Sequence, residues 1–202
     1  MFCMISGGSG SGKSEFAEGI IEKMCEYHRE QSGICQRKTS SEAPCIYIAT
    51  MKATDTEAKE KIARHRNMRQ HKGFLTKECF NGLRELSIPK DSIVLLDCLS
   101  NLVANEMFLK DQIKEQVWDE ILQGIVKLQK ESEHLVVVSN EIFSDGIEYD
   151  ALTRKYIENL AVLHQAMAQR ADAVIEVVCG IPIYHKLDTS DKEVCRLCGY
   201  NR

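Results

Sequence analysis

A short segment near the beginning of the chain has the composition and spacing of a phosphate-binding loop. It reads Gly7-Gly8-Ser9-Gly10-Ser11-Gly12-Lys13-Ser14 and matches the pattern G-x-x-x-x-G-K-[ST]. Glycines let the backbone wrap closely round a phosphate and turn several N–H groups inward at a helix N-terminus. In such a loop the lysine reaches the β and γ phosphates, and the serine hydroxyl ligates Mg²⁺. The segment therefore predicts a nucleoside triphosphate site, in preference to a flexible glycine–serine turn that happens to hold a lysine.

An acidic residue that suits the metal side of this site comes at the end of an apolar run. The run Ser92-Ile93-Val94-Leu95-Leu96-Asp97 is typical of a buried strand ending in the carboxylate that a phosphate loop needs on a neighbouring strand. Such strand ends are common by chance, but beside a phosphate loop this one makes Ser14 and Asp97 the predicted Mg²⁺ ligands. Asn140 and Glu141 follow another apolar run, which would place them at the carboxyl edge where ligands bind in open α/β sheets. A polar turn without function is an equally good interpretation of these two residues.

A histidine lies within a basic cluster further along the chain, in the segment Arg64-His65-Arg66-Asn67-Met68-Arg69. Like charges this close on a helix repel one another, so the cluster makes sense if it faces a polyanion. Each arginine would bind two phosphate oxygens at once, while a neutral imidazole could attack phosphorus. From composition alone, a solvated basic face is the favoured interpretation.

Apolar runs that alternate with amphipathic stretches must position these residues. The runs are rich in Val, Ile and Leu without polar alternation, as in strands covered on both faces, and lie at 2–6, 45–49, 93–97, 135–139 and 173–178. Helices are predicted over 13–29, 55–71, 112–131 and 150–171, the last capped by Asp150. The alternation predicts an α/β fold of the P-loop type, a single domain with a mainly parallel sheet and helices on both faces.

The domain is expected to cover residues 1–187, with 29–44 as a solvated excursion and 188–202 as a polar, loosely held tail. A net charge of −4 over 202 residues gives no electrostatic reason to expect nucleic acid as a partner. Nine cysteines are an odd number, several lie in apolar runs, and neither a signal peptide nor a membrane span precedes them. These features predict a reduced, cytoplasmic protein. Cys195 and Cys198 have a zinc-ligand spacing, but without a second pair a reduced tail is the favoured interpretation.

Taken together, the order and spacing of these stretches resemble the bifunctional adenosylcobinamide kinase/adenosylcobinamide-phosphate guanylyltransferases of cobalamin biosynthesis. The resemblance runs from residue 4 to about residue 186. Beyond the phosphate loop, the matching stretches are 47–50, 62–69, 76–79, 95–98, 139–141 and 177–181.

The resemblance implies an enzyme with two steps. It would phosphorylate adenosylcobinamide with ATP or GTP, and then transfer GMP from GTP to that phosphate through a guanylyl-histidine, giving adenosylcobinamide-GDP and pyrophosphate. The family's guanylylated histidine matches His65, and Lys13 is the second catalytic residue. The family's nucleotide contacts match the loop 7–14 together with Ala49, Thr50, Met51, Arg66, Asn67, Met68, Arg69, Glu78 and Asp97. The family fold is related to recombinase-type ATPases, and its members form homotrimers.

The chain departs from the family pattern in four places. Asp97 stands where the family often has Glu, the glycine-rich continuation after Glu141 is replaced by 142–146, the connection at 29–44 is longer, and the tail after Lys186 has no counterpart. A P-loop small-molecule kinase without the guanylyl step, and a non-catalytic nucleotide-binding regulatory subunit, remain the alternatives. His71 is the rival nucleophile. The preference for ATP or GTP, and the fit of a corrinoid to 142–146, stay open at this stage.

Overall fold

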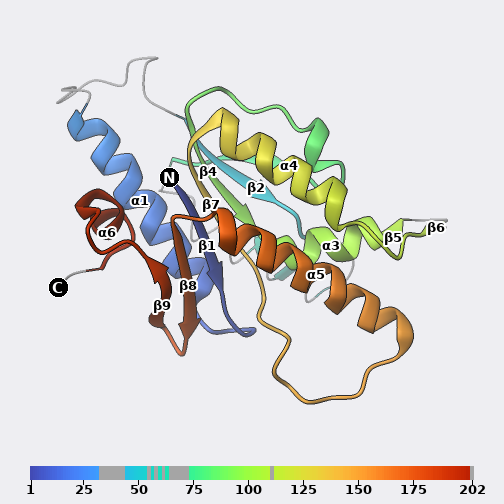
Figure 1. Ribbon diagram of the computed structural model, residues 1–202. Helices are drawn as coiled ribbons and strands as arrows, with labels where there is room; N and C mark the ends of the chain where they lie inside the picture. The colour runs from blue at the N-terminus through green and yellow to red at the C-terminus, as the bar shows by residue number, and fades with distance from the viewer. Residues whose placement is uncertain are drawn as a thin grey trace.

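A twisted, mainly parallel sheet forms the centre of the protein (Figure 1). The computed structural model describes residues 1–31, 44–53, 56, 59–60, 62–63, 73–109 and 112–200. Within these residues the sheet has seven strands in the order β3-β2-β4-β7-β1-β8-β9. The strands are β1 (Phe2–Ser6), β2 (Cys45–Ala49), β3 (Leu75–Glu78), β4 (Ser92–Asp97), β7 (Ser132–Val138), β8 (Ala173–Val178) and β9 (Ile181–Leu187). All neighbours pair in parallel except β9, which is antiparallel to β8.

Helices cover both faces of the sheet, in two separate cores (Figure 1). The helical elements are α1 (Lys13–Gln31), η1 (Leu83–Glu85), α3 (Leu99–Met107), α4 (Trp118–Glu131), α5 (Ala151–Arg170) and α6 (Lys192–Leu197). One core joins α3, α4 and α5 to the sheet, and the other joins α1 and α6 to its opposite face. A small hairpin of β5 (Phe108–Leu109) and β6 (Gln112–Ile113) projects from the end of α3.

The strand sequences explain this layering. Successive side chains of a strand point to opposite faces, so Met4 enters the α3–α5 core and Ile5 enters the α1 core. All six residues of β4 are buried, as expected for a strand with helices on both sides. Each fully buried aliphatic side chain contributes about 1.5–3 kcal/mol relative to exposure, so unbroken apolar runs are needed at the centre.

Most of the predicted elements are confirmed, and the helix expected over 112–131 is wrong at its start. Its first residues form β6, and α4 begins only at Trp118. The predicted cap is confirmed, because the Asp150 carboxylate accepts hydrogen bonds from the backbone N–H groups of Leu152 and Thr153, at 2.9 and 3.0 Å. The strands β3 and β9 and the helix α3 were not predicted. The helix expected over 55–71 lies mostly outside the described residues.

The expectation of a loosely held C-terminal tail is wrong for its last part, from α6 to residue 200. The helix α6 packs on α1, and Leu197 and Cys198 are buried in the α1 core, with exposed fractions of 1% and 0%. A hydrogen bond with Cys198, together with burial, raises the pKa of the Cys3 thiol well above its ordinary value. The tail therefore shields the strand that leads into the phosphate loop.

Two cysteines lie side by side. The sulfur atoms of Cys25 of α1 and Cys45 of β2 are adjacent, but their Cα atoms are 7.4 Å apart, farther than in an ordinary disulfide, so the pair does not overturn the expectation of reduced cysteines. The free cysteines among the described residues are Cys3, Cys79, Cys98, Cys179, Cys195 and Cys198. In the described part of the chain, the helices lack the length and apolar character needed to cross a bilayer.

The contact between α4 and η1 requires a glycine. A Cβ at Gly124 would lie 2.9 Å from Cβ and Cγ of Leu83, which real structures do not tolerate. We predict that Gly124→Ala lowers the free energy of unfolding by about 1–3 kcal/mol, the usual cost of overpacking. The matched control is Gly19→Ala, since this position in α1 has nothing within 4 Å of a built Cβ. Gly19→Ala should raise the free energy of unfolding by up to about 1 kcal/mol, because alanine has a higher helix propensity than glycine. Urea unfolding measures both, and equal effects of the two substitutions would contradict the packing argument.

Candidate active site

The predicted phosphate loop joins the carboxyl end of β1 to the first turn of α1. Gly10 and Gly12 have φ angles of 74° and 90°, a region of backbone space that favours glycine. Ser11 N–H donates to the carbonyl of Gly8 at 3.2 Å, which closes the turn. Lys13 as a whole is only 8% exposed, and its ammonium donates to the same carbonyl at 2.9 Å. The loop is thus curled round its own lysine, at the N-terminus of a long helix.

Backbone groups from both neighbouring strands hold this loop. From the β7 side, the N–H of Glu141 donates to the carbonyl of Gly7 at 2.9 Å. From the β8–β9 turn, the N–H of Gly180 donates to the carbonyl of Ser11 at 2.8 Å. A Cβ at Gly7 would lie 2.5 Å from the carbonyl oxygen of Val177 and 2.6 Å from Ser11 Oγ, so a larger residue does not fit there. These contacts fix the loop before any ligand binds.

The remaining described residues of the predicted site lie at the same edge of the sheet. Asp97 ends β4, is 9% exposed, and accepts a hydrogen bond from the Tyr47 hydroxyl at 3.0 Å. Thr50 follows β2, and its hydroxyl donates to the carbonyl of Cys98 at 2.7 Å and accepts from the N–H of Cys98 at 2.8 Å. Glu78 ends β3 in an exposed position. Parallel strands thus gather residues that are distant in sequence.

The order of the strands corrects one detail of the sequence prediction. The strand that carries Asp97 does not neighbour β1, because β7 lies between β4 and β1. Adjacent strands are about 4.8 Å apart, so the ends of β1 and β4 are separated by about 10 Å. Ser14 and Asp97 would therefore hold a shared Mg²⁺ ion only together with water or phosphate oxygens, which usually complete its coordination.

The donor set at this edge fits Mg²⁺. The ion prefers oxygen ligands and usually keeps several waters, binding through one or two protein oxygens plus substrate phosphates. Ser14 Oγ and the Asp97 carboxylate are of this kind. Among the described residues no group of three or more His, Cys, Asp or Glu is arranged as a metal cage. Ser11 Oγ is buried within the loop with no hydrogen-bond partner, which suits a loop built to receive further acceptor oxygens.

A polar cluster beside the loop, of two buried serines and a half-buried histidine, was not predicted. His164 of α5 lies with Nε2 2.7 Å from Ser139 Oγ, just after β7, and Ser139 Oγ lies 3.3 Å from Ser100 Oγ of α3. Burial lowers the pKa of His164 to about 4, against a smaller opposing effect of Glu141. The sequence gives His164 only a structural or solvated interpretation, since a helix pattern does not reveal which strand end faces it.

The histidine and arginine cluster is not placed by the structure. His65, Arg66, Asn67, Met68 and Arg69 lie outside the described residues, as does His71. Of the other predicted contacts, Met51 follows the carboxyl end of β2 and is half-buried.

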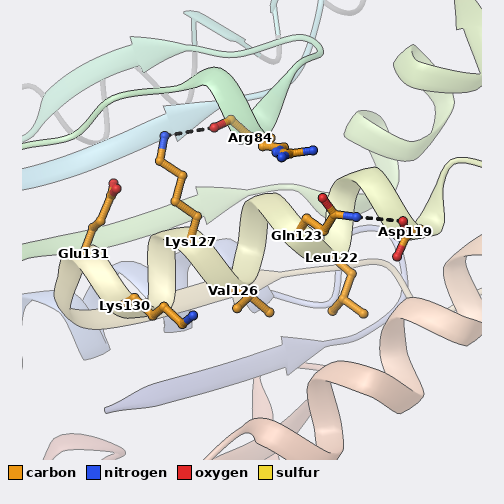
Figure 2. A pocket seen from close by; sticks show the side chains of 8 residues that line it. All are labelled: Arg84, Asp119, Leu122, Gln123, Val126, Lys127, Lys130 and Glu131. Atoms are coloured by element: carbon orange, nitrogen blue, oxygen red, sulfur yellow. Dashed lines mark hydrogen bonds between the residues drawn. The ribbon is translucent and has the colours of Figure 1, made fainter.

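A surface groove of about 470 Å³ lies elsewhere, along α4 (Figure 2). Its lining comes from one side of α4 and from Arg84, with Leu122 and Val126 as its apolar part. Lys127 reaches across to the carbonyls of Arg84 and Leu86, at 2.9 Å each. None of the residues predicted for the active site lines this groove, so it is not the site of the chemistry.

A glycine-rich loop between a parallel strand and a helix, with a buried aspartate at the same sheet edge, defines a P-loop nucleotide-binding protein. The model of the family "cobinamide kinase / cobinamide phosphate guanyltransferase" matches residues 3–184, and the chain belongs to this family. The fold class and the family expected from the sequence are thereby confirmed.

Relatives of known name cover nearly the whole chain. The bifunctional adenosylcobalamin biosynthesis protein CobU of Salmonella typhimurium is 28% identical over 198 residues, covering 91% of this chain and 98% of its own. CobP of Pseudomonas aeruginosa, with the same description, is 28% identical over 183 residues, covering 89% and 94%. A solved structure from Pyrococcus horikoshii OT3 matches with a TM-score of 0.45 and 7% identity, over 96% of this chain and 88% of that one, a similarity too weak to carry any argument.

The lowered pKa of His164 predicts a specific acid sensitivity. Because the folded pKa is about 4 and the unfolded value is ordinary, the unfolded chain takes up a proton first as the pH falls below about 6.5. The free energy of unfolding should therefore decrease as the pH is lowered from about 6.5 to about 4, and the titration of His164 should account for up to about 3 kcal/mol of this decrease.

His164→Gln should flatten this part of the profile of unfolding free energy against pH. The buried His134, whose pKa burial also lowers, is present in both proteins and serves as the internal reference. Identical slopes for wild type and variant would show that the His164 imidazole does not titrate in this range.

Proposed function

We propose that this chain phosphorylates adenosylcobinamide with ATP or GTP and then transfers GMP from GTP to the new phosphate, giving adenosylcobinamide-GDP. The observation that carries the proposal is the complete phosphate loop, held on both sides by β7 and by the β8–β9 turn, in a chain that belongs to the family named for these activities. The two names of the family describe phosphoryl and nucleotidyl transfer, and both need a firmly held triphosphate.

In the first step, the chain acts by positioning and by stabilising charge. The hydroxyl of the cobinamide side arm attacks the γ-phosphorus and loses its proton to water, and the bond to the bridging oxygen breaks to release the nucleoside diphosphate. Lys13 and the inward N–H groups of the loop face the charge that spreads over the transferred group. Mg²⁺, when bound near Ser14 and Asp97, supplies further neutralisation of the phosphate oxygens.

In the second step, His65 is the proposed nucleophile. Its imidazole nitrogen attacks the α-phosphorus of GTP and pyrophosphate leaves; the cobinamide phosphate then attacks the same phosphorus, and the imidazole leaves. Arg66 and Arg69 steady the charged oxygens. This assignment is supported by the family to which the chain belongs, whose name includes guanylyl transfer.

We further propose a homotrimer in the cytoplasm, where nucleoside triphosphates are available. Exposed apolar side chains on the β5–β6 hairpin, Phe108 and Ile113, are available for burial in such an assembly. The free thiols among the described residues fit a reducing compartment.

Lys13→Ala tests the phosphate loop. The variant should lose both activities by at least about a hundredfold, because removing a preorganised cation from developing phosphate charge costs ~3 kcal/mol or more. The measurement is the initial rate of phosphorylated and guanylylated cobinamide formation with Mg²⁺-GTP. Turnover close to that of wild type would remove the loop from the mechanism.

His65→Ala separates the two activities. The variant should lose guanylyl transfer and keep much of the phosphorylation, since the kinase step needs no protein nucleophile. Wild-type protein incubated with GTP labelled at the α-phosphorus should retain an acid-labile label, and γ-labelled GTP is the control that leaves none at this residue. Retention of α-label by His65→Ala would make His71 the nucleophile. No label on wild type would leave only a kinase, and tight nucleotide binding without any turnover would indicate a regulatory subunit.

A further inference from the structure

The helix α5 carries two polar side chains, one buried and one half-buried, that face different parts of the molecule. Asn159, near its middle, is 3% exposed, and His164 lies further along the helix. A buried polar group is costly unless it is hydrogen-bonded, so the partners of each show what it stabilises.

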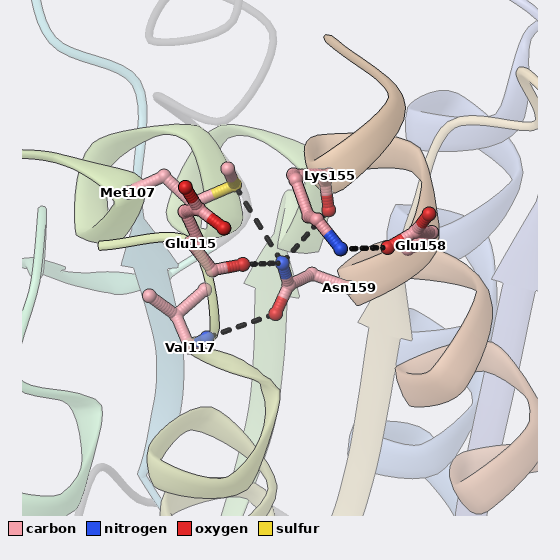
Figure 3. Close-up of polar contacts among 6 residues, drawn as sticks. All are labelled: Met107, Glu115, Val117, Lys155, Glu158 and Asn159. Atoms are coloured by element: carbon pink, nitrogen blue, oxygen red, sulfur yellow. Dashed lines mark hydrogen bonds and ion pairs between the residues drawn. The ribbon is translucent and has the colours of Figure 1, made fainter. Parts of the chain in front are cut away.

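Asn159 organises the connection between α3 and α4 (Figure 3). Its carbonyl oxygen accepts from the N–H groups of Val117 and Trp118 at 2.8 and 3.1 Å, at the N-terminus of α4. Its amide donates to the carbonyls of Glu115 and Lys155 at 2.7 and 2.8 Å. These contacts join α5 to the segment that follows the β5–β6 hairpin, and none of them reaches the phosphate loop.

The partners of His164, by contrast, lead directly to the loop. Its Nε2 holds Ser139 Oγ at 2.7 Å, in the turn that follows β7. On the other side of this turn, Ser100 Oγ of α3 accepts from the N–H of Asn140 at 2.8 Å. Two helices thus fix the side chain of one residue and the backbone of the next, and leave the turn a single arrangement.

The same turn holds the entry to the phosphate loop. Its backbone N–H groups alternate in direction: Ser139 donates to the carbonyl of Ile5 and Glu141 to that of Gly7, each at 2.9 Å. The residue between them donates to Ser100. A shift of this turn would move the carbonyl of Gly7, the first residue of the loop, and with it the N–H groups that face the phosphates.

The imidazole also supports the segment after the turn. The ring of Phe143 lies edge-on against the ring of His164, with centroids 5.2 Å apart and an interplanar angle of 81°. The Glu141 carboxylate accepts from the N–H of Phe143 at 2.9 Å, so the segment is tied back to the turn. One side chain therefore braces both the phosphate loop and the altered segment 142–146.

We propose that His164 is a positioning residue for the nucleotide, acting through Ser139 on the phosphate loop. The inference rests on the proposed function only in that the bound nucleotide is a triphosphate. The interaction that matters is the hydrogen bond to Ser139 Oγ, and the imidazole itself does not touch the substrate.

The test measures nucleotide affinity without cobinamide. A fluorescent N-methylanthraniloyl derivative of GTP, with Mg²⁺, is titrated into purified wild type and variants, and the thermal midpoint of each variant is recorded beside its Kd. His164→Leu should weaken binding about tenfold, the usual effect of one lost buried hydrogen bond. His164→Gln places an amide where Nε2 lies and should bind within about twofold of wild type.

Ser139→Ala provides the second route to the same bond and guards against a His164→Leu variant that does not fold. It should also weaken binding about tenfold. The Kd of the double variant should exceed the Kd of either single variant by no more than about twofold, because both changes remove the same interaction. Asn159→Leu is the matched control on α5: it should lower the thermal midpoint and leave the Kd unchanged.

The proposal is overturned if folded His164→Leu and Ser139→Ala bind the nucleotide as tightly as wild type, or if Asn159→Leu weakens binding equally, which would show a general effect of stability. Failure of wild type to modify cobinamide, with nucleotide binding intact, would remove the proposed function and leave this inference standing.

Discussion

The geometry at the active edge depends on the parallel pairing of β1 with β7 on one side and β8 on the other. A phosphate loop has to present N–H groups inward and must therefore satisfy its own carbonyl groups elsewhere. Here the carbonyls of Gly7 and Ser11 accept hydrogen bonds from backbone N–H groups that follow β7 and β8. Without these neighbours the loop would have no fixed position relative to the sheet, and the charge of Lys13 would have no fixed direction.

The two cores stabilise this pairing from opposite faces. The α1 core fixes the helix whose N-terminus completes the loop, while the α3–α5 core fixes the helices that brace the turn after β7. The position of β7 between β1 and β4 also separates the end of the strand that leads into the loop from the end of the strand that carries Asp97.

The sequence predicted the central strands well and the edges poorly. Strands such as β1 and β4 are covered on both faces, so their unbroken apolar runs indicate them in the sequence. The edge strand β9 has no unbroken apolar run to indicate it, because Ile181 and Ile183 are exposed and Pro182 lies between them. The error over 112–131 has a similar origin, because Ile113 continues the apolar spacing of the helix but pairs with Phe108 in a hairpin.

The candidate site, too, could be predicted from the sequence only in part. The phosphate loop and Asp97 were predictable because a local sequence pattern indicates each of them. The pairing of His164 with Ser139 was not, since it joins residues 25 positions apart on a helix and a strand end, and no spacing rule links the two. The packing of Cys198 beside Cys3 is equally long-range.

The most direct test of the account is the mass of the product that wild-type protein makes. Purified protein is incubated with Mg²⁺, GTP and adenosylcobinamide, and the corrinoid is analysed by mass spectrometry. The account predicts adenosylcobinamide-GDP, with the phosphorylated corrinoid as the intermediate seen at early times. Recovery of the corrinoid unchanged, while the protein binds GTP, would contradict it.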